Sequence, residues 1–333
     1  MVSYRQYVVD ERLRYFKPDG AAPSAPFARE VRDGLAGPEK RIDPRFLYDR
    51  RGSGLFERIC GLDEYYLTRA ETSILEAAAQ EIAGIVGDGT RLVELGSGAS
   101  VKTRILLDAL GGSTEYVPVD VSDILEESSE LLLRDYPGLR ITGILDTYEG
   151  GLGLLGELGG GRSLLAFLGS SYGNFEPERG MRFLGDVRGA MAPGDHFLVG
   201  LDLVKDAGRL EAAYDDREGV TAEFNLNLLH RMNAELGADF DPSKFAHRAI
   251  YHGAEQRIGM YLVSESAQSV SVPGAGLRVD LAEGESIRTE YSHKFLPGQI
   301  TAMLREAGLE EARSWTDPDG LFSLTLARRP GRT

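Results

Sequence analysis

Acidic and polar residues stand at the ends of several short apolar runs, where the strands of a parallel sheet would bring them together. Glu94 and the turn Gly96-Ser97-Gly98 follow Leu92 and Val93. Asp120 comes about 20 residues later, at a spacing suited to accepting hydrogen bonds from ribose hydroxyls. Asp146, at the end of the next run, could accept from an adenine amino group. The spacing predicts a site for a nucleoside-like ligand at one sheet edge.

The glycine turn narrows the class of ligand. Glycines allow a tight turn and a close backbone approach, and a following helix presents free N–H groups. A dinucleotide fingerprint would need a third glycine at Ser100 or Val101, and a phosphate loop would need one directly before Lys102. The remaining E-x-G-x-G form is typical of S-adenosylmethionine-dependent methyltransferases. A turn without a ligand, with Asp120 and Asp146 as capping residues, is the alternative.

A second group of candidate residues lies near the C-terminal end. Glu290 and Ser292 are two apart in a strand-like run, so they point to one face. A carboxylate and a hydroxyl at this spacing can bind a small ring or an amine, whereas the alternative is a solvated outer face. Met260, in a neighbouring run, is expected to pack in the core. The scattered histidines predict no metal site.

Composition restricts the partners. The chain has 333 residues with 42% hydrophobic content and a net charge of −15, which argues against nucleic acid and anionic membranes. Its single cysteine, Cys60, excludes an internal disulfide and favours a reducing cytoplasm. We find no signal-peptide pattern and no apolar run long enough to span a membrane. We therefore expect a cytoplasmic protein, monomeric, with a small-molecule substrate.

The order of the elements predicts an α/β protein. Strands alternate with helices from Leu92 to about Leu203, which indicates a parallel sheet covered on both faces. The glycine-rich stretch 150–161 is expected to be a flexible surface connection. After Asp206 a helical stretch and several alternating strands predict an inserted α+β subdomain, and a final antiparallel pair rejoins the first sheet. We assign 63–205 plus 296–333 to the cofactor domain and 1–62 plus 206–295 to a substrate-binding subdomain.

Several long blocks in order resemble one family, the histidine Nα-methyltransferases of ergothioneine biosynthesis. These blocks include LVELGSGASVKTR, AFLGSSYGNF, FNLNLLHRMNAEL, RIGMYL and TEYSHKF. The resemblance covers roughly residues 40–328. It implies a class I methyltransferase, Rossmann-like sheet with an inserted substrate subdomain, S-adenosylmethionine as cofactor, and trimethylation of L-histidine to hercynine.

The resemblance also implies roles for individual residues. The cofactor would contact Gly96, Ser97, Gly98, Lys102, Asp120, Asp146, Thr147 and Gly169. The substrate carboxylate would be held by Asn174 and Tyr214, which together with Tyr48 near the amine form the expected catalytic set. The imidazole would be held by Tyr65, Glu290 and Ser292, with Met260 as a wall of the pocket.

Three residues depart from the family pattern, namely Leu67, Thr147 and Tyr172. Tyr172 stands where a smaller aliphatic residue is usual, close to Asn174. If Tyr172 reshapes the pocket, another amino acid would be the substrate. A non-catalytic S-adenosylmethionine-binding protein is a further alternative, from a different class.

Overall fold

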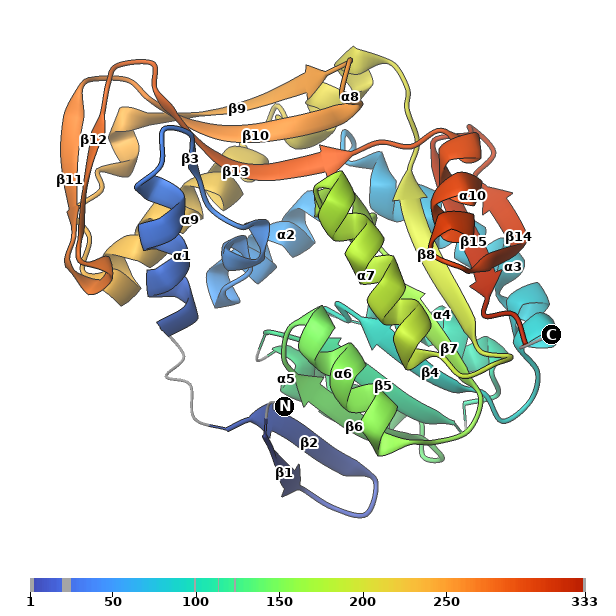
Figure 1. Cartoon of the computed structure of the whole chain (residues 1–333). Coiled ribbons are helices and arrows are strands. Elements are labelled where there is room, and N and C mark those ends of the chain that lie inside the picture. Colours follow the sequence, from blue (N-terminus) through green and yellow to red (C-terminus); the bar gives the residue numbers. More distant parts are fainter. Residues whose placement is uncertain (1–2, 20–24, 99, 113, 123, 332–333) are drawn as a thin grey trace. The chain divides into compact units, whose positions relative to one another are not determined.

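The computed structural model describes residues 3–19, 25–98, 100–112, 114–122 and 124–331 (Figure 1). These residues form two compact units. The first unit comprises Met1–Asp19, Leu67–Val204 and Phe295–Thr333, and the second comprises Gly20–Tyr66 and Lys205–Lys294. The division differs from the expected one at the N-terminus, because 3–19 pair with the large sheet and not with the expected substrate subdomain.

The first unit contains a nine-stranded sheet in the order β1-β2-β6-β5-β4-β7-β8-β15-β14. Its strands are β1 (Tyr4–Val8), β2 (Leu13–Pro18), β4 (Arg91–Leu95), β5 (Glu115–Asp120), β6 (Arg140–Leu145), β7 (Ser163–Phe167), β8 (His196–Asp202), β14 (Glu310–Thr316) and β15 (Phe322–Arg328). The six consecutive strands β2-β6-β5-β4-β7-β8 pair in parallel, whereas β1, β15 and β14 pair antiparallel to their neighbours. The central order β6-β5-β4-β7-β8 is that of a Rossmann-like sheet, which confirms the predicted fold class.

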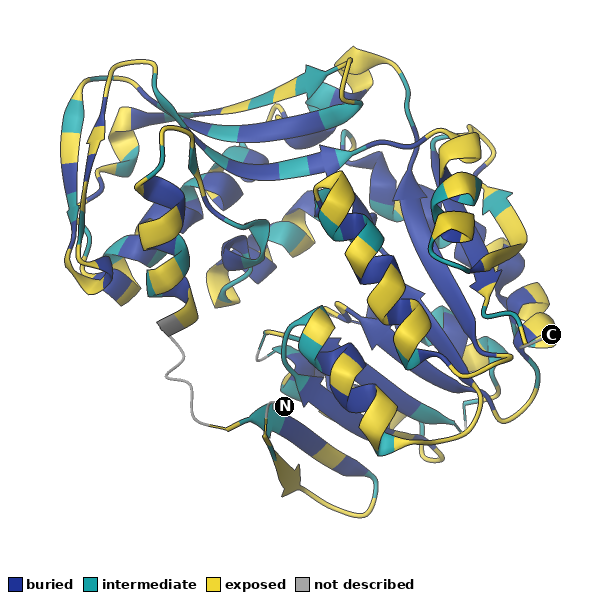
Figure 2. Cartoon of the chain, in the orientation of Figure 1, coloured by how far each residue is buried: buried dark blue, intermediate teal, exposed yellow. Residues whose placement is uncertain are grey.

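The central strands are apolar because both faces of the sheet are covered. All residues of β4, β7 and β8 are buried, and Figure 2 shows these strands as buried along their length. The helices of the first unit are α3 (Tyr66–Val86), α4 (Val101–Ala109), α5 (Ile124–Asp135), α6 (Tyr148–Leu158), α7 (Pro177–Ala190) and α10 (Pro297–Glu306), with the 3-10 turn η2 (Ser171–Asn174). Side chains of α6, α7 and α10 join those of the strands in one apolar core.

Helix α6 corrects the expectation of a flexible connection at 150–161. Thr147 caps the helix by accepting a hydrogen bond from the Gly150 N–H at 3.3 Å, and Leu152 and Leu155 are buried. A Cβ on Gly151 would collide with the side chain of Val119, so the glycine allows helix and strand to pack closely. Burial of the leucines outweighs the low helix propensity of the glycines.

The second unit combines helices with two small sheets. Its helices are α1 (Ala25–Leu35), α2 (Arg50–Cys60), α8 (Ala207–Tyr214) and α9 (Val220–Leu236), with short 3-10 turns η1 (Pro44–Leu47), η3 (Pro242–Lys244) and η4 (Pro273–Ala275). One sheet has the order β3-β13-β10-β9, from β3 (Lys40–Arg41), β13 (Ser286–His293), β10 (Arg257–Ser264) and β9 (Phe245–His252). The other pairs β11 (Gln268–Val272) with β12 (Leu277–Leu281).

Two further expectations are confirmed. The stretch after Asp206 is helical and then forms antiparallel strands, and the C-terminal pair β14 and β15 joins β8.

Among the described residues, no helix is both long and apolar enough to cross a membrane.

Candidate functional site

The glycine turn after β4 adopts backbone conformations that favour glycine. Gly96 has a φ of +74° and Gly98 a φ of +48°. A Cβ on Gly96 would lie 2.9 Å from Tyr148 Oη, so a larger residue would displace the tyrosine. Ser97 Oγ, between the two glycines, is buried and has no hydrogen-bond partner among the described residues. Because buried hydroxyls normally find a partner, this turn fits a polar ligand such as the expected cofactor.

Glu94 supports the turn from below. Its Oε2 accepts hydrogen bonds from Thr103 Oγ1 and Tyr116 Oη, both at 2.6 Å. The carboxyl is fully enclosed, and burial raises its pKa to about 7. Glu94 therefore joins β4 to α4 and β5. These contacts fix the two elements that lie next to the glycine turn.

Asp120 joins the end of β5 to the glycine turn. Its Oδ2 accepts from the Gly98 N–H at 3.1 Å, and its Oδ1 accepts from the Ser122 N–H at 2.9 Å. Burial raises the pKa of this carboxyl, and the two backbone donors act against that shift. Each carboxylate oxygen retains acceptor capacity, which is what binding of ribose hydroxyls requires.

Asp146 follows β6 and is held by a residue from the N-terminal strand. Tyr4 Oη donates to Asp146 Oδ2 at 2.5 Å, and the Thr147 N–H donates to Oδ1 at 2.7 Å. Burial and the hydrogen bond to Asp146 raise the pKa of Tyr4, so the tyrosine remains a neutral donor. Sequence reasoning missed Tyr4, since 142 residues separate it from Asp146 and no motif links them.

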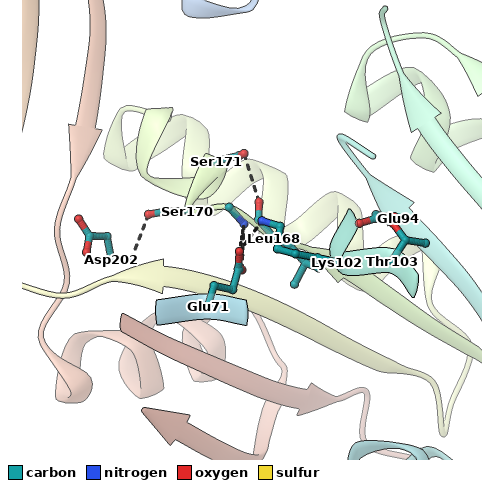
Figure 3. Close-up of polar contacts among 9 residues, drawn as sticks. Glu71, Glu94, Lys102, Thr103, Leu168, Ser170, Ser171 and Asp202 are labelled. Atoms are coloured by element: carbon teal, nitrogen blue, oxygen red, sulfur yellow. Dashed lines mark hydrogen bonds and ion pairs between the residues drawn. The ribbon is translucent and has the colours of Figure 1, made fainter. Parts of the chain in front are cut away.

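An ion pair between a buried carboxylate and a partly exposed lysine joins elements at the same sheet edge (Figure 3). Glu71 on α3 is fully buried, and its Oε2 lies 2.5 Å from Lys102 Nζ on α4. Both oxygens of Glu71 also accept from the Gly169 N–H at 2.9 Å. The carboxylate therefore positions two of the expected cofactor residues, Lys102 and Gly169.

The space for Glu71 is made by Gly200 on β8, where a Cβ would collide with the carboxylate. Sequence reasoning did not single out Glu71. A signal was present, because Glu71 lies on the apolar stripe of α3, with Leu67 four residues before it and Ile74 and Leu75 after it. A carboxylate on a buried stripe needs a partner, and Lys102 provides it.

Tyr172 points into the apolar core. Only 5% of the residue is exposed, and its ring centre lies 6.0 Å from that of Phe175, 6.2 Å from Phe183 and 5.8 Å from Phe295. This packing removes the reason to expect that Tyr172 reshapes an amino-acid pocket. Asn174 ends the turn η2 after β7, in the first unit, whereas Tyr214 is in the second unit. Their joint role at a substrate carboxylate stays a prediction.

In the second unit, Glu290 is a buried carboxyl on β13. Only 6% of the residue is exposed, and no described residue donates a hydrogen bond to its carboxyl group. Burial raises the pKa of Glu290 to about 7, and the nearby charge of Lys294 acts against this shift. Met260 faces Glu290 across the β10–β13 pair and is also buried. A buried carboxyl without a donor is a candidate ligand-binding group.

Ser292, on the same strand as Glu290, contacts Tyr214 of α8. Ser292 Oγ and Tyr214 Oη lie 2.8 Å apart, and Lys294 Nζ lies 2.9 Å from each oxygen. Ser292 and Lys294 are both 2% exposed. Sequence reasoning identified Ser292 and Tyr214 but missed Lys294, although Lys294 continues the alternation of Glu290 and Ser292 along the same face.

His247 on β9 holds the backbone at Tyr214. Asn225 Nδ2 donates to His247 Nδ1 at 2.9 Å, so the proton is on Nε2, which donates to the Tyr214 carbonyl at 2.8 Å. Burial lowers the pKa of His247, and the neutral ring is the form that this arrangement needs. His247 therefore fixes the Tyr214 carbonyl through Nε2, while Nδ1 accepts from Asn225.

Aromatic rings gather near Tyr65. The Tyr65 ring centre lies 6.0 Å from that of Phe56 and 6.3 Å from that of Tyr214. Tyr48 packs edge-to-face on Phe56 at 5.3 Å between centres. Within the second unit the structure thus brings together the expected residues Tyr48, Tyr65, Tyr214, Met260, Glu290 and Ser292 around buried polar and aromatic groups.

The model of the family described as histidine-specific methyltransferase, SAM-dependent, matches residues 27–329. The chain belongs to this family. The matched residues include both the glycine turn and the Glu290–Ser292 strand. The description of the family agrees with the predicted cofactor, S-adenosylmethionine, and with the predicted amino-acid substrate.

Two relatives match this family member over nearly their whole length. The histidine N-alpha-methyltransferase of Mycolicibacterium smegmatis is 44% identical over 95% of this chain and 98% of its own length. That of Mycobacterium tuberculosis is 46% identical over 90% of this chain and 94% of its own. Ergothioneine biosynthesis protein 1 of Neurospora crassa is 33% identical over 87% of this chain, which spans 33% of that longer protein.

Proposed function

We propose that this protein is an S-adenosylmethionine-dependent N-methyltransferase that trimethylates the α-amine of L-histidine to hercynine, a step of ergothioneine biosynthesis. The observation that carries the substrate assignment is Glu290, a buried carboxyl that receives no hydrogen bond from the described residues, two residues from the buried Ser292. A carboxyl and a hydroxyl on one face suit the two nitrogens of an imidazole ring. The 44–46% identity to two histidine N-alpha-methyltransferases supports the same assignment.

The cofactor site in this proposal is the carboxyl edge of the first unit's sheet. When bound, S-adenosylmethionine supplies a methyl group on a positively charged sulfur, which is already activated for transfer. Asp120 accepts from its ribose and Asp146 from its adenine, while Thr147 borders the ring. Other contacts to the cofactor would come from Gly96, Ser97, Gly98, Lys102 and Gly169.

The substrate residues act by orientation. Glu290, Ser292 and Tyr65 hold the imidazole, Met260 packs against it, and Tyr214 with Asn174 binds the carboxylate. Fixing both ends of the amino acid leaves the α-amine as the movable group and aligns its lone pair for attack. Neutral polar groups suit the surroundings of the amine, because a carboxylate would hold its proton.

The amine must lose a proton before each transfer. Tyr48 or a water molecule beside it relays this proton away from the nitrogen. The ring and carboxylate remain anchored as methyl groups are added. The quaternary ammonium product is stabilised by the faces of nearby aromatic rings.

The alternatives have lost their specific support. Preference for another amino acid depended on Tyr172, whose ring packs against Phe175 and Phe183. A non-catalytic binder is favoured by no observation. We further propose that the protein is a cytoplasmic monomer that binds neither nucleic acid nor membrane. Size-exclusion chromatography with light scattering tests the oligomeric state. We also propose that the first unit binds the cofactor and the second the substrate.

The test is a mass-spectrometric methylation assay with S-adenosylmethionine and an equimolar mixture of the twenty amino acids. We expect trimethylated histidine as the sole product. Glu290→Gln should raise KM for histidine at least about tenfold, in line with loss of a charged hydrogen bond of about 1.5–3 kcal/mol. Glu283→Gln, at an exposed residue of the same unit, is the matched control and should leave KM unchanged.

Each other outcome has a distinct meaning. A methylated product from a different amino acid would overturn the substrate while leaving the enzyme class. Cofactor binding without any product would favour the non-catalytic alternative. An unchanged KM in Glu290→Gln would remove Glu290 from the ring site.

A further inference from the structure

Lys294 directly follows the last residue of β13. Only 2% of Lys294 is exposed, although a lysine is almost never buried unless polar groups accompany it. Its Nζ lies 2.9 Å from Tyr214 Oη and from Ser292 Oγ, and 4.6 Å from the centre of the Tyr214 ring. The second unit therefore buries a cation against two residues assigned to the substrate.

The hydrogen-bond directions in this cluster follow from its chemistry. An ammonium only donates, so Lys294 occupies one lone pair on each hydroxyl oxygen and consumes neither hydroxyl proton. The two oxygens are 2.8 Å apart, a distance that requires one hydroxyl proton to lie between them. The other hydroxyl proton is not consumed within the cluster, so the two hydroxyls together have one proton to donate outside it.

We propose that Lys294 is a positioning residue that sets ring specificity by making Ser292 an acceptor. The inference rests on the proposed function. When the substrate carboxylate accepts the proton of Tyr214, the Ser292 hydroxyl donates to Tyr214 Oη. Ser292 Oγ then has a lone pair for the ligand, and it suits an N–H group of the ring.

Glu290 completes the selection of the ring. It lies two residues before Ser292 on the same face and has no donor among the described residues. A ring with an N–H towards Ser292 and a second nitrogen towards Glu290 satisfies both groups, with one proton shared between that nitrogen and the carboxyl. A ring without an N–H offers no donor to that lone pair of Ser292 Oγ, so it should bind more weakly than imidazole.

The alternative role for Lys294 is to fill space. A space-filling residue would need neither the charge nor the donors, so Lys294→Met should then preserve ring selectivity. Lys294→Arg keeps the charge and an all-donor group, and it should rescue selectivity in part if the donors matter. Lys244→Met, at an exposed lysine of the same unit that pairs with Asp241 at 3.8 Å, is the matched control.

The experiment measures KM and kcat for histidine, the Kd for S-adenosylmethionine, and inhibition by 3-(thiazol-4-yl)alanine, whose ring has a nitrogen but no N–H. We expect Lys294→Met to raise KM for histidine about tenfold or more and to reduce discrimination against the thiazole by a similar factor. The Kd for the cofactor should change less than about twofold. Lys244→Met should match the wild type in every measurement.

The outcomes separate this inference from the proposed function. Lack of histidine turnover by the wild type would overturn both. With an active wild type, unchanged selectivity in Lys294→Met, or equal weakening of cofactor and histidine binding, would overturn the inference alone. If Lys294→Met does not fold, Ser292→Ala decides, since it should weaken histidine binding but not thiazole binding. Equal weakening of both ligands by Ser292→Ala would overturn the acceptor role.

Discussion

Glu71 Oε2 and Lys102 Nζ lie 2.5 Å apart, and the Glu71 carboxylate also accepts the backbone N–H of Gly169. One buried side chain on α3 thus holds a residue of α4 and a backbone N–H of the turn that follows β7. The ion pair compensates for burying a carboxylate, which would otherwise be strongly unfavourable.

Glu71→Gln should weaken cofactor binding and destabilise the fold. The amide can accept from Gly169 but cannot compensate the charge of Lys102, so we expect a loss of about 1–3 kcal/mol in the free energy of unfolding. The Kd for S-adenosylmethionine should rise about tenfold. Urea denaturation and calorimetric titration measure the two effects. Glu76→Gln, at an exposed position of α3, is the control, and equal behaviour of both variants would contradict the prediction.

Glu94→Gln should change how stability depends on pH. The folded-state pKa of Glu94 is raised from 4.5 to about 7, so the folded protein binds more protons than the unfolded chain between these values. The stability associated with the neutral carboxyl is fully present below about 4.5 and is lost as pH rises through 7. The free energy of unfolding of the wild type, relative to Glu94→Gln, should fall by roughly 2–3 kcal/mol between those limits.

Urea denaturation at a series of pH values measures this difference. Burial raises the pKa of Glu290 to about 7 as well, so Glu290→Gln should remove a second contribution in the same window. The variant that combines Glu94→Gln and Glu290→Gln should show the weakest dependence of the free energy of unfolding on pH. A wild-type curve parallel to that of Glu94→Gln would mean that Glu94 titrates normally.

Tyr4→Phe should weaken cofactor binding with little effect on stability. The change removes the 2.5 Å hydrogen bond that Tyr4 donates to Asp146 and keeps the ring. We expect the Kd for S-adenosylmethionine to rise about three- to tenfold, as for the loss of one hydrogen bond of about 0.5–1.5 kcal/mol. Tyr7→Phe, at an exposed tyrosine of the same strand, should have no effect. Equal affinities of the two variants would exclude a role for Tyr4.

Tyr172→Ala should lower stability without changing which amino acid is methylated. Removing a ring that packs on Phe175, Phe183 and Phe295 should cost about 3–5 kcal/mol. Tyr172→Phe should retain most of this packing. Thermal unfolding and the twenty-amino-acid assay provide the measurements. A new methylated product from either variant would return Tyr172 to the substrate pocket.

The sequence by itself determined the class of fold and much of the candidate cofactor site. Buried parallel strands require continuous apolar runs, and the residues that follow such runs must meet at one sheet edge, so Asp120 and Asp146 could be placed from spacing alone. The alternation of Glu290 and Ser292 likewise identified one face of a strand. These features depend on residues close together in the chain, so sequence patterns can predict them.

Only the tertiary structure decided the contacts between residues far apart in the chain. Tyr4 reaches Asp146, Glu71 reaches Lys102, and both Ser292 and Lys294 reach Tyr214, although no periodicity predicts these pairs. Most of the glycine-rich segment at 150–161 also lies in α6, because burial of leucines outweighs glycine's low helix propensity. The packing of the Tyr172 ring on Phe175, Phe183 and Phe295 was likewise set by the tertiary structure. A side chain's direction depends on the neighbours that surround it, and those neighbours come from distant parts of the chain.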